Sequence, residues 1–311
     1  MLNQKTRNMK GNLVVTVGIS GSGKSTWSHE KWIKNPSKYV IVNRDKIREL
    51  LFGYTEHSID QYYSRLDVAK LEKRVTRYED TLINDGLNHG KTVIVDATHL
   101  NREYLTRFKY WNVPVEVVVF EVEKDTAILR DFQRQRMVGE AVIEKQYNRF
   151  VNLIKQLSKD PIDFTPVTFE QNTDNDPCVI FDIDGTLAHM NRETRSPYDW
   201  HKVGEDTIDL PTAVMLDALY KTGTRVIICT GRDGVCLKET ESWLNKFQIS
   251  YNDIYIRPKG DQRADWIVKE EMWRNIAEDN YIVGMFDDRL QVVRRARALG
   301  LKVFNVEYNN F

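Results

Sequence analysis

Short apolar segments alternate with longer amphipathic ones through the first half of the chain. The apolar runs predicted to be strands cover residues 12–17, 39–45, 91–98 and 115–122. Apolar residues recur with helical spacing in 27–35, 60–88, 101–111, 127–136 and 143–157. The long 60–88 pattern is predicted to break at Gly86 and Gly90. Strands that alternate with helices predict a parallel sheet in an α/β domain.

A second α/β pattern follows a polar stretch that contains three prolines, residues 158–177, which is typical of a linker. It opens with CVIFDIDGTL at 178–187. Helical patterns follow at 211–223, 238–249 and 290–300, and apolar runs predicted to be strands at 224–232, 281–289 and 301–306. We therefore predict two α/β domains, 1–157 and 178–311, joined by the linker 158–177.

Composition and length agree with two globular domains. The chain has 311 residues, of which 41% are hydrophobic and 29% charged. No apolar run reaches the roughly 18 residues of a membrane span, and the first ten residues lack the apolar core of a secretory signal. The three cysteines, Cys178, Cys229 and Cys236, show no metal-ligand spacing. A reduced cytoplasmic protein with no membrane partner is expected.

Charge is divided unevenly although the net charge is zero. Residues 1–160 hold 27 Lys and Arg against 20 Asp and Glu, and residues 161–311 hold 18 against 25. A basic half suits a polyanionic partner such as a nucleic acid. An excess of seven charges over 160 residues is equally compatible with an ordinary solvated surface.

The stretch GISGSGKST at 18–26 follows the first predicted strand and precedes a helical pattern. It fits G-x-x-x-x-G-K-[ST], whose glycines let backbone N–H groups surround phosphate at a helix N-terminus. The lysine reaches the β and γ phosphates, and the serine hydroxyl contacts Mg²⁺. The predicted nucleotide-binding residues are Gly18, Gly21, Gly23, Lys24, Ser25 and Thr26. A chance glycine-rich turn is the weaker interpretation.

Acidic residues end the next two predicted strands, where open α/β sheets bind ligands. Asp45 is placed to accept the proton of an attacking hydroxyl, and Arg48 one turn later to hold an acceptor phosphate. A helix cap with solvated arginines is the alternative. Asp96 either contacts Mg²⁺ through water or caps a helix. Arg130 and Arg134, with Arg136 nearby, either form a lid over the triphosphate or lie on a solvated face.

The stretch FDIDGTL at 181–187 places Asp182 and Asp184 at the end of an apolar strand. Acids two residues apart point to the same side of an extended chain. One can attack phosphorus while the other protonates the leaving oxygen and later activates water. Two acids that face a phosphate also require a cation, which predicts Mg²⁺.

Later strand ends supply the remaining chemistry. Thr230 offers a hydroxyl to phosphoryl oxygens, with Arg232 beside it, and Asp287 and Asp288 offer further metal ligands. Lys269 is the best candidate to neutralise the phosphoryl group and orient the nucleophile.

These motifs carry a resemblance to known families. DIDGTL, TGR, the segment around Lys269 and the Asp287–Asp288 pair resemble the four motifs of the haloacid dehalogenase (HAD) phosphatase superfamily. From about residue 12 to 305 the chain also resembles the bacteriophage T4 polynucleotide kinase/3′-phosphatase family. The matches that carry this likeness include GSGKSTW, NRD with Arg48, FDIDGTLA, SPYDW behind Arg195, and DDR.

The resemblance implies an N-terminal P-loop kinase and a C-terminal HAD phosphatase with a minimal cap. It implies that Asp45 is the kinase base, that Lys24 and Ser25 serve ATP, and that Arg134 is the catalytic lid arginine with Arg130 one turn before it. It implies that Asp182 is the phosphatase nucleophile and Asp184 its general acid–base. The implied phosphatase substrate and site residues are Arg195, Thr230, Arg232, Arg257, Asp265 and Lys269, and the implied metal ligands are Asp182, Asp184, Asp287, Asp288 and, in the kinase, Ser25.

By this likeness the chain phosphorylates 5′-OH ends of DNA or RNA with ATP. It removes 3′-phosphate, with 2′,3′-cyclic phosphate as a further candidate, and passes its products to a ligase. The likeness also implies a homotetramer and, for a phage-encoded protein, the host cytoplasm. Only 45 residues separate Asp184 from Cys229, which favours an open site that admits a chain end. A small-metabolite kinase fused to a metabolite phosphatase is the alternative. A non-catalytic scaffold would need both sites to be degenerate.

Overall fold

The computed structural model describes residues 11–54, 59–133, 137–191 and 193–306. Contacts divide the chain into two compact units, with the division between Pro166 and Val167. The last helix of the first unit ends at Lys159, and the first strand of the second begins at Asp176.

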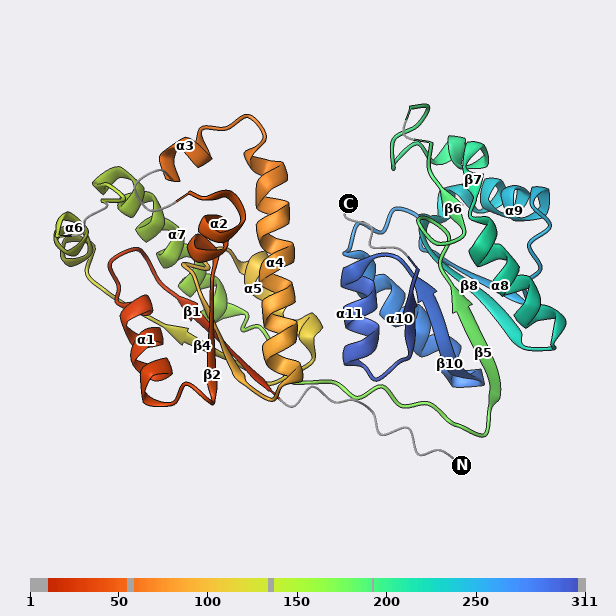
Figure 1. Cartoon of the computed structure of the whole chain (residues 1–311), viewed down its shortest axis with the longest axis horizontal. Coiled ribbons are helices and arrows are strands. Elements are labelled where there is room, and N and C mark those ends of the chain that lie inside the picture. The colour runs from red at the N-terminus through yellow and green to blue at the C-terminus, as the bar shows by residue number, and fades with distance from the viewer. Residues whose placement is uncertain (1–10, 55–58, 134–136, 192, 307–311) are drawn as a thin grey trace. The chain divides into compact units, whose positions relative to one another are not determined.

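The first unit contains a four-stranded parallel sheet in the order β2-β3-β1-β4 (Figure 1). Its strands are β1 (Asn12–Val17), β2 (Tyr39–Asn43), β3 (Thr92–Asp96) and β4 (Val115–Val119). β1 and β3 are buried at almost every position because they lie between other strands. Central strands of parallel sheets read as continuous apolar runs for this reason, so the predicted α/β class is confirmed.

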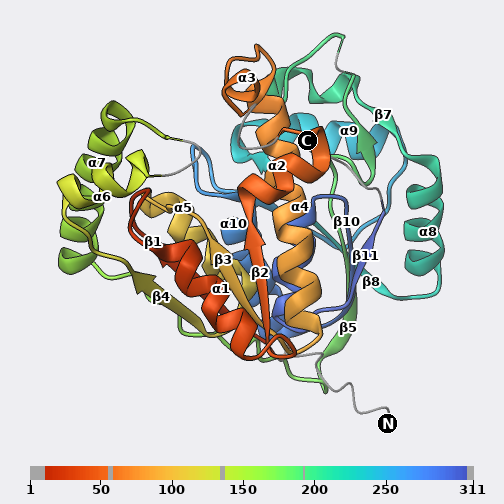
Figure 2. The same ribbon diagram turned by 60° about the vertical axis from the view of Figure 1, so that its left-hand side comes forward.

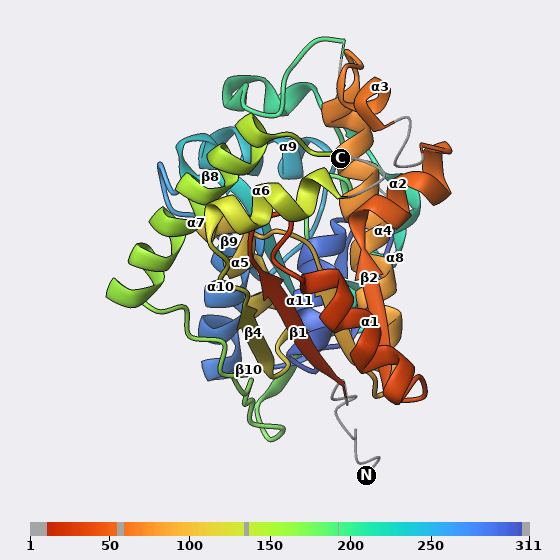
Figure 3. The ribbon, with the colours of Figure 1, turned by 90° about the vertical axis from the view of Figure 1, so that its left-hand side faces the viewer.

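Seven α-helices of the described residues accompany this sheet. They are α1 (Lys24–Lys34), α2 (Arg44–Phe52), α3 (Ile59–Tyr63), α4 (Val68–Asn88), α5 (Arg102–Thr106), α6 (Lys124–Phe132) and α7 (Glu140–Lys159). A 3-10 turn, Arg107–Trp111, continues α5. Helices α1 and α4 both pack on β2 and β3. Helices α6 and α7 contact each other and lie on the β4 side of the sheet (Figures 2 and 3).

The single helix predicted over 60–88 is two helices, and the predicted break at Gly86 is wrong. Helix α4 runs through Gly86 to Asn88, and Gly90 follows it with a positive φ of 70°. A Cβ atom on Gly86 would lie 2.6 Å from a methyl carbon of Val93. The glycine therefore lets α4 approach β3 closely and does not end the helix.

The second unit contains a five-stranded parallel sheet in the order β11-β10-β5-β8-β9. The strands are β5 (Asp176–Phe181), β8 (Arg225–Asp233), β9 (Asp253–Arg257), β10 (Asn280–Asp287) and β11 (Val303–Asn305). The helices are α8 (Leu210–Lys221), α9 (Leu237–Lys246), α10 (Asp265–Asp279) and α11 (Leu290–Ala298). Sequence reasoning placed no strand at β9 and no helix at α10.

Alternate residues of β5 face opposite layers of this sheet. Cys178 and Ile180 join a core that contains residues of α10 and α11, whereas Val179 and Phe181 join one that contains residues of α8 and α9. The two helix pairs lie on opposite sides of the sheet (Figure 1). Strands buried on both faces explain why CVIF carries no polar residue.

The insertion after β5 is small. Strands β6 (Ala188–His189) and β7 (Thr207–Ile208) form a short antiparallel hairpin. Between them the described residues contain one 3-10 turn, Trp200–Glu205. The expected minimal cap is therefore a hairpin and its loop. In the part of the chain that the structure describes, every helix is too short or too polar to cross a membrane.

Candidate active sites

The loop between β1 and α1 has the backbone of a phosphate-binding loop. Gly21 and Gly23 adopt positive φ angles of 82° and 94°, which favour glycine. A Cβ on Gly21 would lie 2.8 Å from the Ala127 carbonyl oxygen, so this glycine also lets α6 approach the loop. Helix α1 begins at Lys24, whose Nζ donates to the Ile19 carbonyl at 2.7 Å. The loop thus brings the N-terminus of α1 and the buried ammonium of Lys24 close together, which favours binding of an anion such as phosphate.

Two further predicted residues, Gly18 within the loop and Arg130 outside it, shape this loop. A Cβ on Gly18 would lie 2.8 Å from both the Phe120 carbonyl and the Ser22 hydroxyl, so Gly18 provides room for packing. Arg130 on α6 donates to the Gly21 carbonyl at 3.1 Å, and its side chain lines a hollow of about 420 Å³ beside the loop. Arg134 and Arg136 lie outside the described residues.

A cavity of about 1120 Å³ joins the phosphate-binding loop to the ends of β2 and β3. Asn43 ends β2, caps α2 through its side chain, and donates to an Asp96 carboxylate oxygen at 3.1 Å. The cavity brings together most residues predicted for the kinase. Among its lining residues are Gly21, Gly23, Lys24, Ser25, Thr26, Asp45, Arg48 and Asp96.

Arg48 on α2 forms a buried ion-pair centre at this cavity. Its Nη1 donates to Asp45 at 2.7 Å, and its Nε and Nη2 donate to the two oxygens of Glu72 at 2.8 and 2.9 Å. Glu72 also accepts from Arg44 at 2.8 Å and from the Tyr62 hydroxyl at 2.6 Å. Burial opposes ionisation of Glu72, but these donors, Arg48 foremost, lower its pKa to about 2.

Sequence reasoning missed Glu72 and a neighbouring cluster. Glu79 is fully buried and accepts from Arg44 and Arg107, each at 2.8 Å. Glu72 and Glu79 are two helical turns apart on α4, so helical spacing alone could have paired them. Their arginine partners lie 24 to 35 residues away, which no local pattern reveals.

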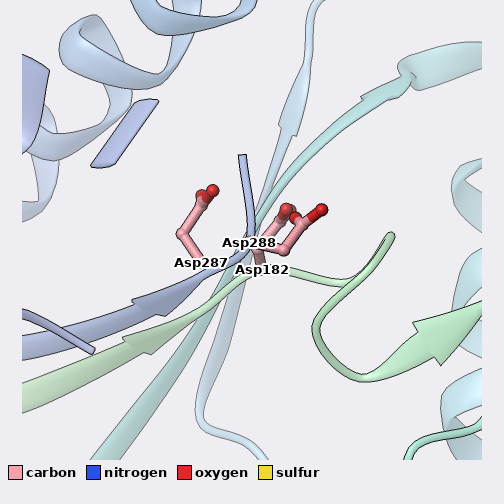
Figure 4. Close-up of side chains that lie close together, drawn as sticks. All are labelled: Asp182, Asp287 and Asp288. Carbon is pink, nitrogen blue, oxygen red and sulfur yellow. The ribbon is translucent and has the colours of Figure 1, made fainter. Parts of the chain in front are cut away.

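The second site lies at the adjoining ends of β5 and β10 (Figure 4). Carboxylate oxygens of Asp182, Asp287 and Asp288 all lie within 4.8 Å of one another. The Nζ of Lys269, which is 1% exposed, lies 3.0 Å from Asp182 and 2.8 Å from Asp287. The Asp182 N–H donates to the Phe286 carbonyl at 3.0 Å, which holds the two strand ends together.

The charges at this site fit a divalent cation. Burial raises the pKa of Asp182 to about 7 against the opposing effect of Lys269, and burial together with Asp182 raises the pKa of Asp288 to about 6. One buried oxygen of Asp288 has no hydrogen-bond partner among the described residues. Three carboxylates with one ammonium leave an excess of negative charge, and carboxylate oxygens are the ligands that Mg²⁺ prefers. Asp184 lies outside this three-carboxylate group.

Asp184 faces arginines instead. Arg232 donates to its two oxygens at 2.9 and 2.8 Å, and Arg195 Nη2 lies 3.5 Å away. Both arginines also hold the buried carboxylate of Asp206, at 2.8 and 2.6 Å. Burial favours the protonated form of Asp184, but Arg232, Arg195 and Lys269 together outweigh burial and lower its pKa. Asp206 was missed because it lies in a loop with several acids and no motif.

The other predicted residues surround the carboxylates at different depths. Arg257 pairs with Asp265 at 2.9 Å, and Asp265 lies 3.9 Å from Lys269. Thr230 is fully buried, and its hydroxyl accepts from the Arg232 N–H at 3.2 Å. A cavity of about 530 Å³ opens over the site. Its lining includes Asp182, Asp184, Arg195, Arg232, Arg257, Asp265 and Asp288, with the unpredicted Arg289.

A phosphate-binding loop lies on one parallel sheet and a D-x-D carboxylate centre on another, and each is a type of site that serves phosphoryl transfer. Residues 176–311 match the family model of the polynucleotide kinase PNKP phosphatase domain, and residues 13–153 match that of an AAA domain. The two matches, one to each half of the chain, support its resemblance to the polynucleotide kinase/3′-phosphatase family. Domains of these two kinds generally use ATP and Mg²⁺.

Two relatives extend the comparison. The chain is 28% identical over 309 residues to a putative bifunctional polynucleotide kinase/RNA ligase of Autographa californica nuclear polyhedrosis virus. The match covers 94% of this chain but only 42% of that relative. A chain in a solved structure of the Pnkp1/Rnl/Hen1 RNA repair complex is 28% identical, with 98% of both chains covered and a TM-score of 0.44.

Proposed function

We propose that this protein heals broken nucleic-acid ends. Its kinase domain transfers the γ-phosphate of ATP to the 5′-OH of a DNA or RNA end, and its phosphatase domain removes a 3′-phosphate. The observation that carries the proposal is the small insertion over the D-x-D site, a hairpin and loop in place of a cap domain, next to a family match for the phosphatase of a polynucleotide kinase. The two products, a 5′-phosphate and a 3′-OH, are the ends that a ligase joins.

In the kinase, donor and acceptor share the cavity that joins the phosphate-binding loop to the ends of β2 and β3. Lys24 binds the β and γ phosphates, and Ser25 with Asp96 would hold Mg²⁺, which supplies charge neutralisation. Asp45 takes the proton of the 5′-OH while the 5′ oxygen forms a bond to the γ phosphorus. The bond between the γ phosphorus and ADP breaks, and ADP leaves. Arg48, fixed by Glu72, holds the first phosphate of the acceptor chain. Arg130, with Arg134 as the catalytic lid arginine, covers the triphosphate.

In the phosphatase, an Asp182 oxygen attacks phosphorus and the bond between phosphorus and the 3′ oxygen breaks. Asp184 gives a proton to that oxygen, and then takes a proton from the water that hydrolyses the aspartyl-phosphate. Lys269 orients Asp182 and balances its charge. The residues that contact the substrate are Arg195, Arg232, Arg257 and Asp265. Thr230 helps to shape the binding site of the phosphoryl group, because its hydroxyl accepts a hydrogen bond from the Arg232 N–H.

These roles require a change of protonation on binding. Asp182 must be ionised to attack, yet burial raises its pKa, and Asp184 must carry a proton, yet Arg232 lowers its pKa. Mg²⁺ held by Asp182, Asp287 and Asp288 would lower the pKa of the nucleophile. A substrate phosphate that engages Arg232 weakens its hold on Asp184, which raises the pKa of that acid.

The alternative of a small-metabolite kinase and phosphatase is not favoured, because the phosphatase domain matches that of a polynucleotide kinase. The non-catalytic scaffold is also disfavoured, because Lys24, Asp45, Asp182 and Asp184 are all present in built sites. We propose hand-off to a ligase, given that a viral relative is described as a polynucleotide kinase/RNA ligase. The homotetramer, the cytoplasmic location and 2′,3′-cyclic phosphate as a substrate stay predictions.

One assay tests the function. The protein is incubated with Mg²⁺, labelled ATP and an oligonucleotide that has a 5′-OH and a 3′-phosphate. Label on the 5′ end and release of inorganic phosphate are expected, with DNA and RNA versions compared. An oligonucleotide that gains no label and loses no phosphate contradicts the proposal.

A further inference from the structure

We propose that Tyr198, backed by Trp200, stacks on the terminal base of a chain that ends in 3′-phosphate. The inference rests on the proposed phosphatase function and adds the residue that distinguishes a nucleic-acid end from any other phosphate ester. It concerns binding of the substrate, since Tyr198 contributes no group to the phosphoryl transfer.

Tyr198 is an exposed aromatic ring at the mouth of the phosphatase cavity. The residue is 79% exposed, so its ring is available to a ligand. It lines the same cavity as Asp182 and Asp184. Trp200, which also lines this cavity, lies beside it with ring centroids 6.4 Å apart and an interplanar angle of 89°. An edge-on partner of this kind supports one ring and leaves its face free for a ligand.

The loop that carries Tyr198 is tied to the catalytic centre. The Ser196 N–H donates to the Asp199 carboxylate at 2.9 Å, and the Asp199 N–H donates to the Ser196 carbonyl at 3.1 Å. Three residues before Tyr198, Arg195 is buried and donates to Asp206 at 2.7 Å while facing Asp184. The loop backbone that carries Tyr198 is therefore anchored beside the proposed general acid.

Two further lining residues of the same cavity suit a phosphodiester backbone. Arg263 and Arg289 line the cavity with side chains that are 48% and 53% exposed. Both arginines pair with acidic side chains, and the exposed parts of their guanidinium groups can still contact phosphates of a bound strand. An aromatic ring and guanidinium groups in one cavity are the combination that binds single strands without sequence preference. A flat base suits this lining better than a protein partner, because the ring shares the cavity with the two acids of the proposed phosphatase.

The test compares substrates that share the scissile phosphate but differ in the base. They are an oligonucleotide 3′-phosphate, the same chain with an abasic 3′-terminal residue, and glycerol 2-phosphate. Stacking of one base contributes roughly five- to hundredfold in affinity. Tyr198→Ala is expected to raise KM for the first substrate on the order of tenfold, with the turnover rate within about twofold. Tyr198→Phe, and Tyr220→Ala on the distant helix α8, are expected to behave as wild type.

The abasic chain makes the test specific to stacking. Wild type is expected to have a higher KM for the abasic chain than for the base-bearing chain, and Tyr198→Ala is expected to raise the KM for the abasic chain no further. Rates on glycerol 2-phosphate are expected to be the same in wild type and in every variant. Equal KM values of wild type for the base-bearing and abasic chains overturn the stacking proposal and need no variant. The stacking proposal is also overturned if Tyr198→Ala raises KM equally for the base-bearing and the abasic chain. A wild-type enzyme that cleaves glycerol 2-phosphate but no oligonucleotide overturns the proposed function, and stacking with it.

Discussion

The ammonium of Lys269 lies 3.0 Å from the carboxylate of Asp182, and both residues are at most 5% exposed. This pair connects α10 to the end of β5 and places a cation beside the proposed nucleophile. Lys269 also binds Asp287, so one side chain spans two strand ends. The relationship explains how three acids can share a small buried volume.

Lys269→Met is expected to slow the turnover of the phosphatase by about 10²–10³, the effect of removing one preorganised charge from a phosphoryl site. Kinase activity of the same variant is expected to stay within about twofold of wild type. Lys221→Met removes an exposed lysine from α8 and serves as the matched control. Steady-state release of inorganic phosphate measures the effect. A Lys269→Met enzyme that keeps a tenth or more of the wild-type rate contradicts the role.

Divalent cation binding is expected to stabilise the phosphatase domain. Excess Mg²⁺ at about 100 times its dissociation constant contributes about 2.7 kcal/mol and raises the melting temperature by several degrees. Asp288→Asn removes a ligand and is expected to lose most of this gain, whereas Asp217→Asn on α8 keeps it. Calorimetry with chelator and then with Mg²⁺ gives the comparison. Identical gains in the two variants count against the three-carboxylate site.

Glu72→Gln is expected to destabilise the kinase domain by about 2 kcal/mol, since it leaves Arg44 and Arg48 without their shared anion. It also frees Arg48 to move, so KM for the oligonucleotide acceptor rises more than KM for ATP. Glu49→Gln breaks an exposed pair with Lys46 and is expected to cost less than about 1 kcal/mol. Urea unfolding and acceptor titrations distinguish the two.

The same glutamate gives a pH dependence with a definite sign. Its folded pKa of about 2 lies below the unfolded value of about 4.3. The contribution of Glu72 is therefore complete above about pH 5 and declines as pH falls toward 2. The stability difference between wild type and Glu72→Gln is expected to shrink from about pH 6 to about pH 3.5. A difference that stays constant or widens over this range would contradict the assignment.

Gly185→Ala is expected to abolish phosphatase activity and to destabilise its domain by more than about 3 kcal/mol. Gly185 has a φ of 86°, and a Cβ atom there would collide with the Asp288 carboxylate. Gly223→Ala is the matched control, because Gly223 has a φ of 84° and open space around it, so only the backbone strain of about 1–2 kcal/mol applies. Similar losses in both variants would mean that the clash with Asp288 is unimportant.

Residues at strand ends could be predicted because of topology. Carboxyl ends of parallel strands meet at one edge, so Asp182, Asp287 and the TGR segment had to converge once the strands were recognised. The partners of Arg48 and Asp184 could not be predicted this way. Glu72 lies within a helix and Asp206 within a loop, and each reaches its arginine only through the tertiary fold. Gly86 misled the helix prediction because close packing on Val93, which requires a glycine, leaves no trace in a single sequence.

The central claim is that two independent sites act on opposite ends of one substrate. One oligonucleotide with a 5′-OH and a 3′-phosphate, incubated with labelled ATP and Mg²⁺, reports both reactions at once. Asp45→Ala is expected to abolish label transfer and keep phosphate release, and Asp182→Ala to abolish release and keep transfer. An Asp182→Ala protein, folded by its melting curve, that loses both reactions would contradict the account.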